Sequence, residues 1–413
     1  MPAVRIAGRK EGRVWYYNSG QGGLGPFRGL GAALAAHGEP YRPRVVSATM
    51  RVSAVVAVAT AIAVGAGCDE SDVRRVSAAQ TPTPSATPEP ARPPRAIRLT
   101  IGVSGDLLPH LQVVARARAL AGGRGYDFRP LLRPIRGWVR RNSLAFCHVE
   151  TPLTPAAPAG YPRFNSPPAL ARAVRATGFD ACSTASNHSV DRGQAGIDAT
   201  RRSLRRAGVR HTGSFSSRRQ QRRPLLLRAR GVRVAFLSYT QTTNGIPLPH
   251  AWSVNLASAR RILRDARRAR RAGARVVIVN LHWGTEYSHA PDASQRALAR
   301  QLGRSRAITA VVGQHAHVVQ PIRRAGRTWV VFGTGNLLSA QTAACCAAGS
   351  QDGMLVRLHL RVGLRRARVE RVTYTPTWVR HPDYTVVRAA RAQRASWLRT
   401  VAVVGRSRRV RPD

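Results

Sequence analysis

Apolar and polar residues follow two patterns along the chain, and each pattern predicts one kind of element. Short runs of Val, Ile, Leu and Phe, bounded by Gly or polar residues, predict buried strands. Segments with apolar residues three or four positions apart, and Arg between them, predict amphipathic helices. We expect strands at residues 98–104, 144–149, 179–183, 225–230, 232–239, 275–281, 308–312, 328–333, 353–361 and 368–374, and helices at 168–176, 193–207, 256–271 and 292–303. This alternation predicts an α/β fold, and the later strands, with few helices between them, predict mixed sheets.

Short polar segments follow four of the predicted strands. They are Ser104-Gly105-Asp106, Ser186-Asn187-His188, His282-Trp283-Gly284-Thr285-Glu286 and Gly313-Gln314-His315-Ala316-His317. In an α/β sheet, ligands bind at the carboxyl ends of the strands. Asp, Asn and His side chains that gather there are typical ligands of a divalent metal ion. Each residue alone has a simpler explanation, such as Asp106 capping a helix or His282 being a hydrogen-bonded core residue, so the prediction depends on their combination.

A fifth strand adds a carboxylate to this set. Glu150 directly follows a predicted strand, and His148 lies on the same side of that strand because side chains alternate. Asn187 offers a neutral oxygen to a metal ion, and the neighbouring His188 can act as a general acid. The sequence therefore predicts metal ligands and a proton donor at one edge of the sheet.

Together these segments resemble those of the bacterial capsule synthesis protein CapA family, whose members are linked to poly-γ-glutamate capsule production. The resemblance extends from about residue 98 to about residue 374. It includes Gly105-Asp106, Glu150-Thr151-Pro152-Leu153, Asn187-His188 with Asp191 and Gly193, His282-Trp283-Gly284 with Glu286-Tyr287, Pro291 and Gln295, and Gly313, His315, His317 and Gly335-Asn336. It implies a calcineurin-like metallophosphatase fold, which is a sandwich of mixed β-sheets flanked by helices.

The resemblance also implies a role for each matching residue. The positions of the metal ligands match Asp106, Glu150, Asn187, His282, His315 and His317. Of these, Asp106 and His317 would bind a first ion, Glu150 would bridge it to a second, and the other three would complete the second site. His188 would donate a proton to a leaving group. Four further residues would support the ligands or contact the substrate: His148, Asp191, Glu286 and Asn336. The expected cofactor is one or two divalent ions of zinc, manganese or iron, which suit mixed His, Asn and carboxylate ligands.

The chain departs from the family pattern at several positions. Leu108 stands where a full phosphatase site has a His, and Glu150 replaces the bridging Asp. His148 and Ser186 each replace an Asn, and Thr309 replaces an Asp. These departures concern mainly the first metal site. A single bound ion is therefore an alternative to a two-ion site, and binding without chemistry is an alternative to metal-dependent hydrolysis.

The charge of the chain indicates an anionic partner. Its 67 Lys and Arg residues outnumber 19 Asp and Glu residues, which gives a formal net charge of +48, and Lys10 is the only lysine. Arginines cluster on two predicted helices, at 201–206 and 260–268. An anionic polymer or a phosphorylated precursor would be attracted to such faces. A merely solvated surface is the simpler alternative.

An internal segment predicts export to the cell surface. Met50-Arg51 precedes the apolar run 52–67, which ends in Gly65-Ala66-Gly67 directly before Cys68. A short basic start, an apolar stretch and small residues form a signal peptide. The residues before Cys68 resemble a bacterial lipobox, so we expect Cys68 to carry the lipid of a membrane lipoprotein; an uncleaved anchor and an ordinary cleaved signal are the alternatives. Because the expected protein is exported, nucleic acid is not an expected partner despite the charge.

These features divide the chain into five expected segments. They are an upstream extension without packed elements (1–49), a lipoprotein signal peptide (50–68), a Pro/Thr/Ser-rich linker (69–97), a CapA-like metallophosphatase-fold domain (98–380) and a basic tail (381–413). An exported protein can form disulfides. Cys147 and Cys182 are therefore either a disulfide between neighbouring strands or two small buried hydrophobic residues.

The predicted function is the biosynthesis or export of an anionic surface polymer similar to poly-γ-glutamate, at the extracytoplasmic face of the cell membrane. A divalent-metal site of the predicted kind can serve hydrolysis or group transfer. The alternative is a lipoprotein that binds the polymer through its arginines without chemistry.

Overall fold

The chain folds as two separate units. The computed structural model describes residues 4–10, 13–18, 96–364, 366–389 and 393–413. Its contacts divide the chain into Met1–Arg92 and Pro93–Asp413. In the first unit, strands β1 (Val4–Lys10) and β2 (Arg13–Asn18) form an antiparallel pair. The sequence predicted no packed element there, but the run Val14-Trp15-Tyr16-Tyr17 in β2 is rich in the β-branched and aromatic residues that favour strands.

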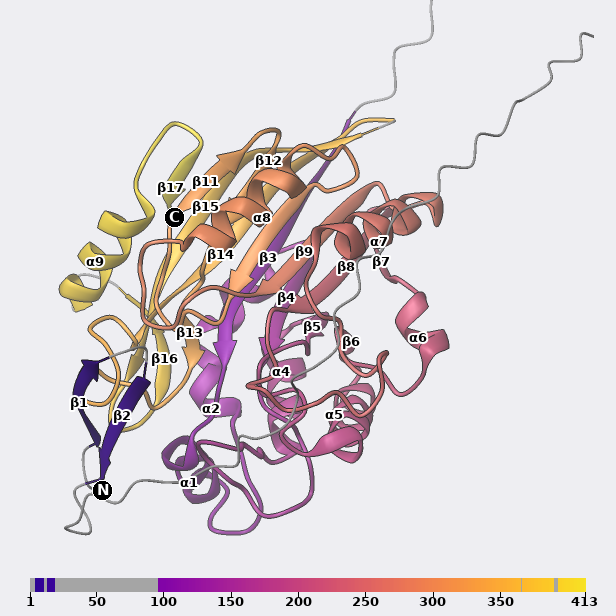
Figure 1. Cartoon of the computed structure of the whole chain (residues 1–413). Helices are drawn as coiled ribbons and strands as arrows, with labels where there is room; N and C mark the ends of the chain where they lie inside the picture. Colours follow the sequence, from indigo (N-terminus) through magenta and orange to yellow (C-terminus); the bar gives the residue numbers. More distant parts are fainter. Residues whose placement is uncertain (1–3, 11–12, 19–95, 365, 390–392) are drawn as a thin grey trace, which may run out of the picture. The chain divides into compact units, whose positions relative to one another are not determined.

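The second unit is built on two β-sheets, which Figure 1 shows as two layers of strands. The strands of the larger sheet are β3 (Ile97–Leu107), β4 (Leu144–Val149), β5 (Ala181–Ser183), β6 (Arg210–Thr212), β13 (Asn336–Leu338), β14 (Asp352–Val362), β15 (Ala367–Arg380), β16 (Thr385–Arg388) and β17 (Val410–Pro412). The strands of the smaller sheet are β7 (Leu225–Ala229), β8 (Val232–Thr240), β9 (Val276–His282), β10 (Ala310–Gln314), β11 (Ile322–Ala325) and β12 (Thr328–Val331).

Both sheets are mixed. The larger sheet has the order β16-β15-β14-β3-β4-β5-β6, with β13 beside β3 and β17 beside β15, and the smaller has the order β11-β12-β10-β9-β8-β7. Strands β3 to β6 are parallel, as are β8, β9, β10 and β12. The outer hairpins are antiparallel. The parallel strands of each sheet therefore end at a common edge, and this edge carries the polar segments.

Most of the helices cover the outer faces of the two sheets. The helices are α1 (Leu111–Leu120), α2 (Arg129–Leu132), the 3₁₀ turn Arg133–Ile135, α3 (Arg136–Arg140), α4 (Ala169–Thr177), α5 (Gly193–Arg206), α6 (Arg218–Arg222), α7 (Ala259–Arg271), α8 (Ala293–Gly303) and α9 (Arg394–Val404). One hydrophobic cluster lies between the sheets, where Phe146 of β4 stacks on Phe236 of β8 with ring centroids 4.2 Å apart. A second cluster packs α1 to α4 on the larger sheet, and a third packs α7 and α8 on the smaller sheet. Burial of these apolar faces holds the layers together.

The fold class predicted from the sequence is confirmed: two mixed sheets flanked by helices form an α/β sandwich. Every strand and helix expected from the hydrophobic pattern is present, with ends shifted by a few residues in most cases. The elements that were not expected are short, such as α6, or carry little apolar periodicity, such as α9. Their formation depends on tertiary contacts that a local pattern does not contain.

The expected boundary at residue 380 is not where the folded unit ends. Strands β16 and β17 pair with β15, and Val404 and Val410 belong to the cluster between the sheets. The side chain of Asp413 accepts a hydrogen bond from Arg357 at 3.0 Å. The segment 381–413 is therefore part of the domain rather than a separate basic tail, because its few apolar residues are sufficient to pack against the edge of the larger sheet.

Two disulfides occur in the described part of the chain. One joins Cys147 of β4 to Cys182 of β5, which decides between the two alternatives for these residues. The other joins the adjacent residues Cys345 and Cys346. Cys68 and the expected signal peptide lie outside the described residues. Of the helices in the part that is described, none has the length and apolar character to cross a membrane.

Candidate metal centre

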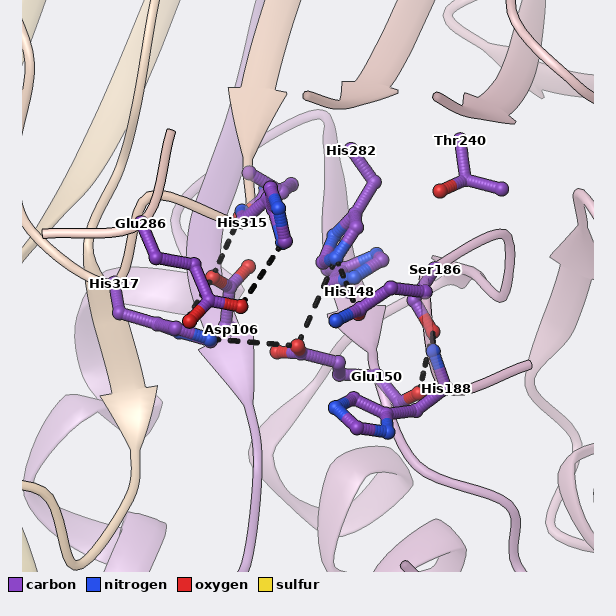
Figure 2. Close-up of polar contacts among 12 residues, drawn as sticks. Asp106, His148, Glu150, Ser186, His188, Thr240, His282, Glu286, His315 and His317 are labelled. Atoms are coloured by element: carbon purple, nitrogen blue, oxygen red, sulfur yellow. Dashed lines mark hydrogen bonds and ion pairs between the residues drawn. The ribbon is translucent and has the colours of Figure 1, made fainter. Parts of the chain in front are cut away.

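Polar side chains from both sheets meet at the edge where the parallel strands end (Figure 2). In the larger sheet, β3 carries Asp106 and Glu150 directly follows the neighbouring strand β4. In the smaller sheet, β9 ends at His282, and the neighbouring strand β10 leads into His315 and His317. The backbone N–H of His315 donates to Asp106 Oδ2 at 3.1 Å and so joins the two sheets at this edge.

The histidines and carboxylates lie within ion-pair distance of one another. His317 lies between the two carboxylates, with Nδ1 3.4 Å from Asp106 Oδ2 and Nε2 3.6 Å from Glu150 Oε1. His282 Nε2 lies 3.7 Å from the same Glu150 oxygen. The rings of His282 and His315 have centroids 4.5 Å apart. All of these side chains are buried.

Glu150 belongs to two groups of ligand atoms. It lies with His282 and His315 in one group and with Asp106 and His317 in another, and the atoms of each group are all within 4.8 Å of one another. A carboxylate shared in this way has the placement that a bridging ligand needs. These two groups correspond to the two halves of the site that the family resemblance implied, but two other groups cut across them, Asp106 with His148 and His282, and Glu286 with His315 and His317.

Several buried polar atoms of the cluster have no hydrogen-bond partner among the described residues. They are Asp106 Oδ1, Glu150 Oε1 and Oε2, His148 Nε2, His282 Nδ1 and His315 Nδ1. Each such atom costs about 1–3 kcal/mol when it is left unpaired, and native proteins seldom leave buried polar atoms in this state. A divalent cation would accept the lone pairs and balance the carboxylates, so the residues present fit a metal ion.

Polar side chains hold one nitrogen of several of these imidazole rings. The pairs are His148 Nδ1 with Ser183 Oγ (2.6 Å), His282 Nε2 with Asn187 Oδ1 (2.8 Å) and His317 Nδ1 with Asn336 Oδ1 (3.1 Å). Where the partner is an amide oxygen, the ring N–H is the donor. Such partners fix the orientation of an imidazole and leave its second nitrogen free for a metal ion. Asn336 and Ser183 therefore support the cluster without entering it.

A carboxylate orients His188 at the side of the cluster. Its Nδ1 lies 2.8 Å from Asp191 Oδ2, which also accepts the backbone N–H of Phe164 at 2.7 Å. Ser186 Oγ donates to the carbonyl of Glu150 at 2.6 Å and accepts the backbone N–H of His188 at 3.1 Å (Figure 2). Because Asp191 holds Nδ1, the Nε2 atom of His188 is free to exchange a proton with a substrate.

The loop after β10 presents its two histidines from a strained backbone. His315 and His317 have φ angles of 91° and 55°, in the left-handed region that residues other than glycine seldom adopt. Gly313, just before them, lies against the next strand, and a Cβ atom there would be 1.7 Å from the carbonyl oxygen of Phe332. Strain of this kind is concentrated at functional sites. Here it turns both imidazoles toward the same carboxylates.

Burial keeps three of the histidines neutral. It lowers the pKa of His148 to about 4 and that of His282 well below its usual value. Burial together with the charge of His317 lowers the pKa of His315 to about 3. Neutral imidazole is the form that binds a metal ion, so these three side chains need to lose no proton when an ion enters.

The pKa values of Glu150 and His317 are raised instead of lowered. Burial raises the pKa of Glu150 well above its usual range, against the opposing effect of His317. Burial alone would lower the pKa of His317, but the carboxylates of Glu150 and Asp106 raise it to about 10. These two side chains together therefore retain a proton at neutral pH when no ion is bound.

We expect metal affinity to rise with pH. An entering cation must displace the proton that Glu150 and His317 retain, so affinity should increase roughly tenfold per pH unit for each proton released, up to the His317 pKa of about 10. Calorimetric titration with Zn²⁺ in two buffers of different ionisation enthalpy measures the number of protons released. An affinity that does not change with pH, with no proton released, would contradict this electrostatic description.

All the site residues predicted from the sequence, apart from Cys68, lie at this edge. His148, expected to support the ligands, instead offers a ligand atom in a group with Asp106 and His282. Glu286 lies at the margin, with Oε1 3.9 Å from His315 Nδ1 and a partly exposed side chain. Leu108, which replaces a family histidine, is buried.

His110 also lies beside the cluster, although it was not among the residues predicted from the sequence. Its ring packs edge-on against Phe164, with centroids 5.4 Å apart, and its Nδ1 contacts the carbonyl of Leu108 at 3.0 Å. Burial, followed by the charges of His317 and His188, lowers its pKa to about 4. Its position four residues after Asp106 could have indicated it, since both follow the strand predicted at residues 98–104.

Comparison with known proteins identifies relatives over part of the chain. The family model described as "Bacterial capsule synthesis protein PGA_cap" matches residues 100–341. "Capsule biosynthesis protein CapA" of Bacillus anthracis is 28% identical over 195 residues, which are 46% of this chain and 46% of that protein. "PGA biosynthesis protein CapA" of Bacillus subtilis (strain 168) is 26% identical over 185 residues, 44% of this chain and 47% of that protein. The matches thus span about half the length of these curated relatives.

Comparison with solved structures gives alignments at low sequence identity. The NAD nucleotidase of Haemophilus influenzae aligns with a TM-score of 0.41 and 12% identity, over 77% of this chain and 64% of that chain. The calcineurin-like phosphoesterase YfkN of Bacillus subtilis aligns with a TM-score of 0.39 and 13% identity, over 68% of this chain and 90% of that chain. At these scores the likeness adds no argument about the site.

The family match covers more than half of the chain and contains the whole cluster. Its range, 100–341, begins just before Asp106 and ends just after Asn336. The residues that converge in the structure are thus residues of the matched segment. On this evidence the chain belongs to the bacterial capsule synthesis protein family PGA_cap.

Proposed function

We propose that the protein is a metal-dependent enzyme of capsule biosynthesis that hydrolyses or transfers an anionic group of the polymer or of a phosphorylated precursor. Membership of the PGA_cap family supports a role in capsule biosynthesis. The observation that carries the chemistry is the set of unpaired ligand atoms of Asp106, Glu150, His282 and His315 in one buried cluster. A purely structural cluster would be expected to pair these atoms with one another or with the backbone.

Each residue of the cluster would have a separate role in such a reaction. When bound, one or two divalent ions would polarise an anionic oxygen of the substrate. Glu150 and Asp106 supply the negative charge that holds the ions, and His188 with Asp191 behind it is placed to protonate a leaving group. Glu286, on the exposed side of His315, lies where a substrate can reach the pocket.

His148 offers a specific reason why the departures from the family pattern are compatible with metal binding. The first strand lacks the usual histidine, since Leu108 occupies that position. His148, whose Nε2 atom has no hydrogen-bond partner among the described residues, offers a ligand atom within 4.8 Å of those of Asp106 and His282. An imidazole on the neighbouring strand would thus replace the one missing from β3. Zinc, manganese and iron all accept this mixture of donors.

The test is the metal content of the purified chain. Protein stripped with a chelator and titrated with Zn²⁺ or Mn²⁺ should bind one or two ions per chain, with protection against thermal unfolding that grows with the free ion concentration. No binding of either ion, and no change in the melting temperature, would contradict the proposal. Substitutions of individual ligands, described in the Discussion, separate this pocket from adventitious sites.

We further propose that the protein is tethered to the extracytoplasmic face of the membrane through Cys68. The apolar run and the small residues before Cys68 support this, and the Cys147–Cys182 disulfide is typical of exported proteins. A chain expressed from Met50 should fractionate with membranes, and Cys68→Ala should leave it unlipidated. A product that remains cytosolic with its cysteines reduced would contradict the location.

An arginine-lined groove favours a second candidate function, polymer binding without chemistry. The groove lies between α6 and α7, with a cavity of about 790 Å³. Its lining includes Arg218, Arg222, Arg260, Arg261, Arg264 and Arg268, and one acidic residue, Asp265. On α5, the guanidinium of Arg201 is already engaged by Ser216 and Gln220, whereas the groove gathers six arginines around one hollow. The groove is thus the better candidate for an anionic chain.

Binding of poly-glutamate to this groove is expected to depend on salt. Raising the salt concentration from about 0.05 M to about 0.2 M should weaken it at least about tenfold, because exposed charges are screened. Arg260→Gln with Arg264→Gln should weaken it at low salt, whereas Arg116→Gln with Arg118→Gln on α1 should not. Fluorescence anisotropy of a labelled polymer measures both effects. Equal losses in the two variants would show that the groove has no special role.

A further inference from the structure

The end of the second unit opposite the metal centre is covered by arginines. It is formed by the amino ends of β3, β10 and β12 and by the turn between β14 and β15. Figure 1 shows the start of β3 beside this turn at one end of the unit, and α1 at the other. At about 3.3 Å per residue along β3, Ile97 lies roughly 30 Å from Asp106. This end is therefore separate from the metal centre.

Two adjoining cavities at this end carry an excess of positive charge. The larger has a volume of about 870 Å³, and its lining includes Arg306, Arg324, Arg327, Arg361, Arg366 and Arg409. The smaller has a volume of about 390 Å³ and shares Arg409 and Glu370 with it. Among the described residues, the one ion pair that involves this lining joins Arg368 to Glu370 at 3.5 Å. Arg270, Arg230 and Arg371 contact protein acceptors as well. The six arginines named above in the larger lining make no such contact within the described residues, and their guanidinium groups are left to bind an external anion.

An exposed leucine lies at the tip of this end. Leu364, in the β14–β15 turn, is 74% exposed, and Arg361 and Arg366 are close to it in sequence and exposed. A single exposed leucine is common on protein surfaces. At the tip of a hairpin and among arginines, however, it matches the combination of an apolar tip and a basic surround that binds membrane interfaces. We call this leucine and the linings of the two cavities the basic face.

The chain enters the second unit at the basic face. The unit begins at Pro93, and its first strand starts at Ile97, which pairs with Val362 beside the turn. The linker 69–97 and the apolar run 52–67 directly precede that strand in the sequence. A lipid at Cys68 would thus be connected to the domain at the basic face rather than at the metal centre.

From these observations we infer that the basic face docks on the surface of an anionic phospholipid bilayer. Guanidinium groups bind phosphate oxygens in a two-pronged geometry, and arginines close to an anionic lipid surface are attracted to it. The apolar tip favours a bilayer over a soluble anionic polymer or a nucleic acid, which offer no hydrocarbon. The inference rests on the proposed tethering at Cys68 and goes beyond it, because it orients the domain with its metal centre facing away from the membrane.

The experiment uses the second unit without the apolar run. Residues 93–413 form a compact unit that contains all the hydrophobic clusters of the described residues, so we expect this segment to fold by itself. This protein is sedimented with vesicles of phosphatidylcholine alone or mixed with phosphatidylglycerol. The test variant is Arg324→Gln with Arg327→Gln and Arg366→Gln. The matched control, Arg116→Gln with Arg118→Gln and Arg124→Gln, removes the same charge at α1.

The expected result is strong binding to the mixed vesicles alone. Each arginine at the surface should contribute about fivefold, so the test variant should partition about 100-fold more weakly. The control should change partitioning less than about threefold, because its charges lie more than a Debye length from the bilayer. Leu364→Ser, which leaves the charge intact, should weaken binding several-fold.

Three results would contradict the docking of the basic face on a bilayer. They are equal binding to both kinds of vesicle, equal losses in the test and control variants, and loss of poly-glutamate binding in the test variant without any preference for anionic vesicles. Metal content separates this failure from failure of the proposed function. The test variant should retain its metal, since none of its arginines lies near the cluster. A protein that binds metal but not vesicles therefore contradicts the docking of the basic face and leaves the proposed metal-dependent function intact.

Discussion

Replacing His282 or His315 with alanine is expected to weaken metal binding at least about 100-fold. Loss of a supporting residue behind a ligand typically costs 10–100-fold in affinity, and loss of a direct ligand should cost more. Both histidines lie in the ligand group that contains Glu150. Asn187→Ala should cost less, about tenfold, because a neutral amide is a weaker ligand. Part of this loss would come from His282, which Asn187 orients through a 2.8 Å contact. Competition with a chromogenic chelator measures all three affinities.

A matched histidine substitution controls for damage to the fold. His359 lies on β14 and contacts Thr373 Oγ1 at 3.0 Å, and it pairs with Thr100 near the start of β3, far from the strand ends that carry the cluster. His359→Ala should therefore bind metal like the unchanged protein. If His282→Ala and His315→Ala bind as tightly as this control, the pocket is not the metal site, and polymer binding becomes the better account of the chain.

The main elements of the fold could be predicted because their pattern is local. Runs such as Val276-Val277-Ile278-Val279 define a buried strand without reference to the rest of the chain, and the arginines on α7 define its exposed face. The end of the domain could not be predicted in this way. Val404 ends a short apolar run and Val410 stands alone among arginines, and both become core residues because α9 packs beside β15 and β17 pairs with residues 372–374 of that strand.

The membership of the cluster could be predicted, but the details of its geometry could not. The positions of Asp106, Glu150 and His282 at strand ends follow from the strand pattern and from the rule that ligands gather there. Which ring nitrogen of each histidine remains available for a metal ion does not follow from this pattern. It depends on Ser183 behind His148 and on Asn336 behind His317, and these partners come from segments that are distant in sequence.

His188→Ala is expected to slow metal-dependent turnover of a phosphate ester by about 10²–10⁴-fold, the usual contribution of a general acid. Its metal content should be unchanged, because His188 Nδ1 is engaged by Asp191 and no ligand group includes this residue. Asp191→Asn should give a smaller loss, since the imidazole remains but loses the carboxylate that holds its proton and orientation.

The leaving group provides the sharper test of this role. Phenoxide is a poorer leaving group than 4-nitrophenoxide and depends more on a proton donor, so His188→Ala should lose more rate on phenyl phosphate than on 4-nitrophenyl phosphate. Equal losses on the two esters would show that His188 positions the substrate rather than protonates it. Loss of metal in His188→Ala would instead make it a ligand. Because Ser186 ties the backbone of His188 to the carbonyl of Glu150, Ser186→Ala should reproduce part of the rate loss through misplacement, but without dependence on the leaving group.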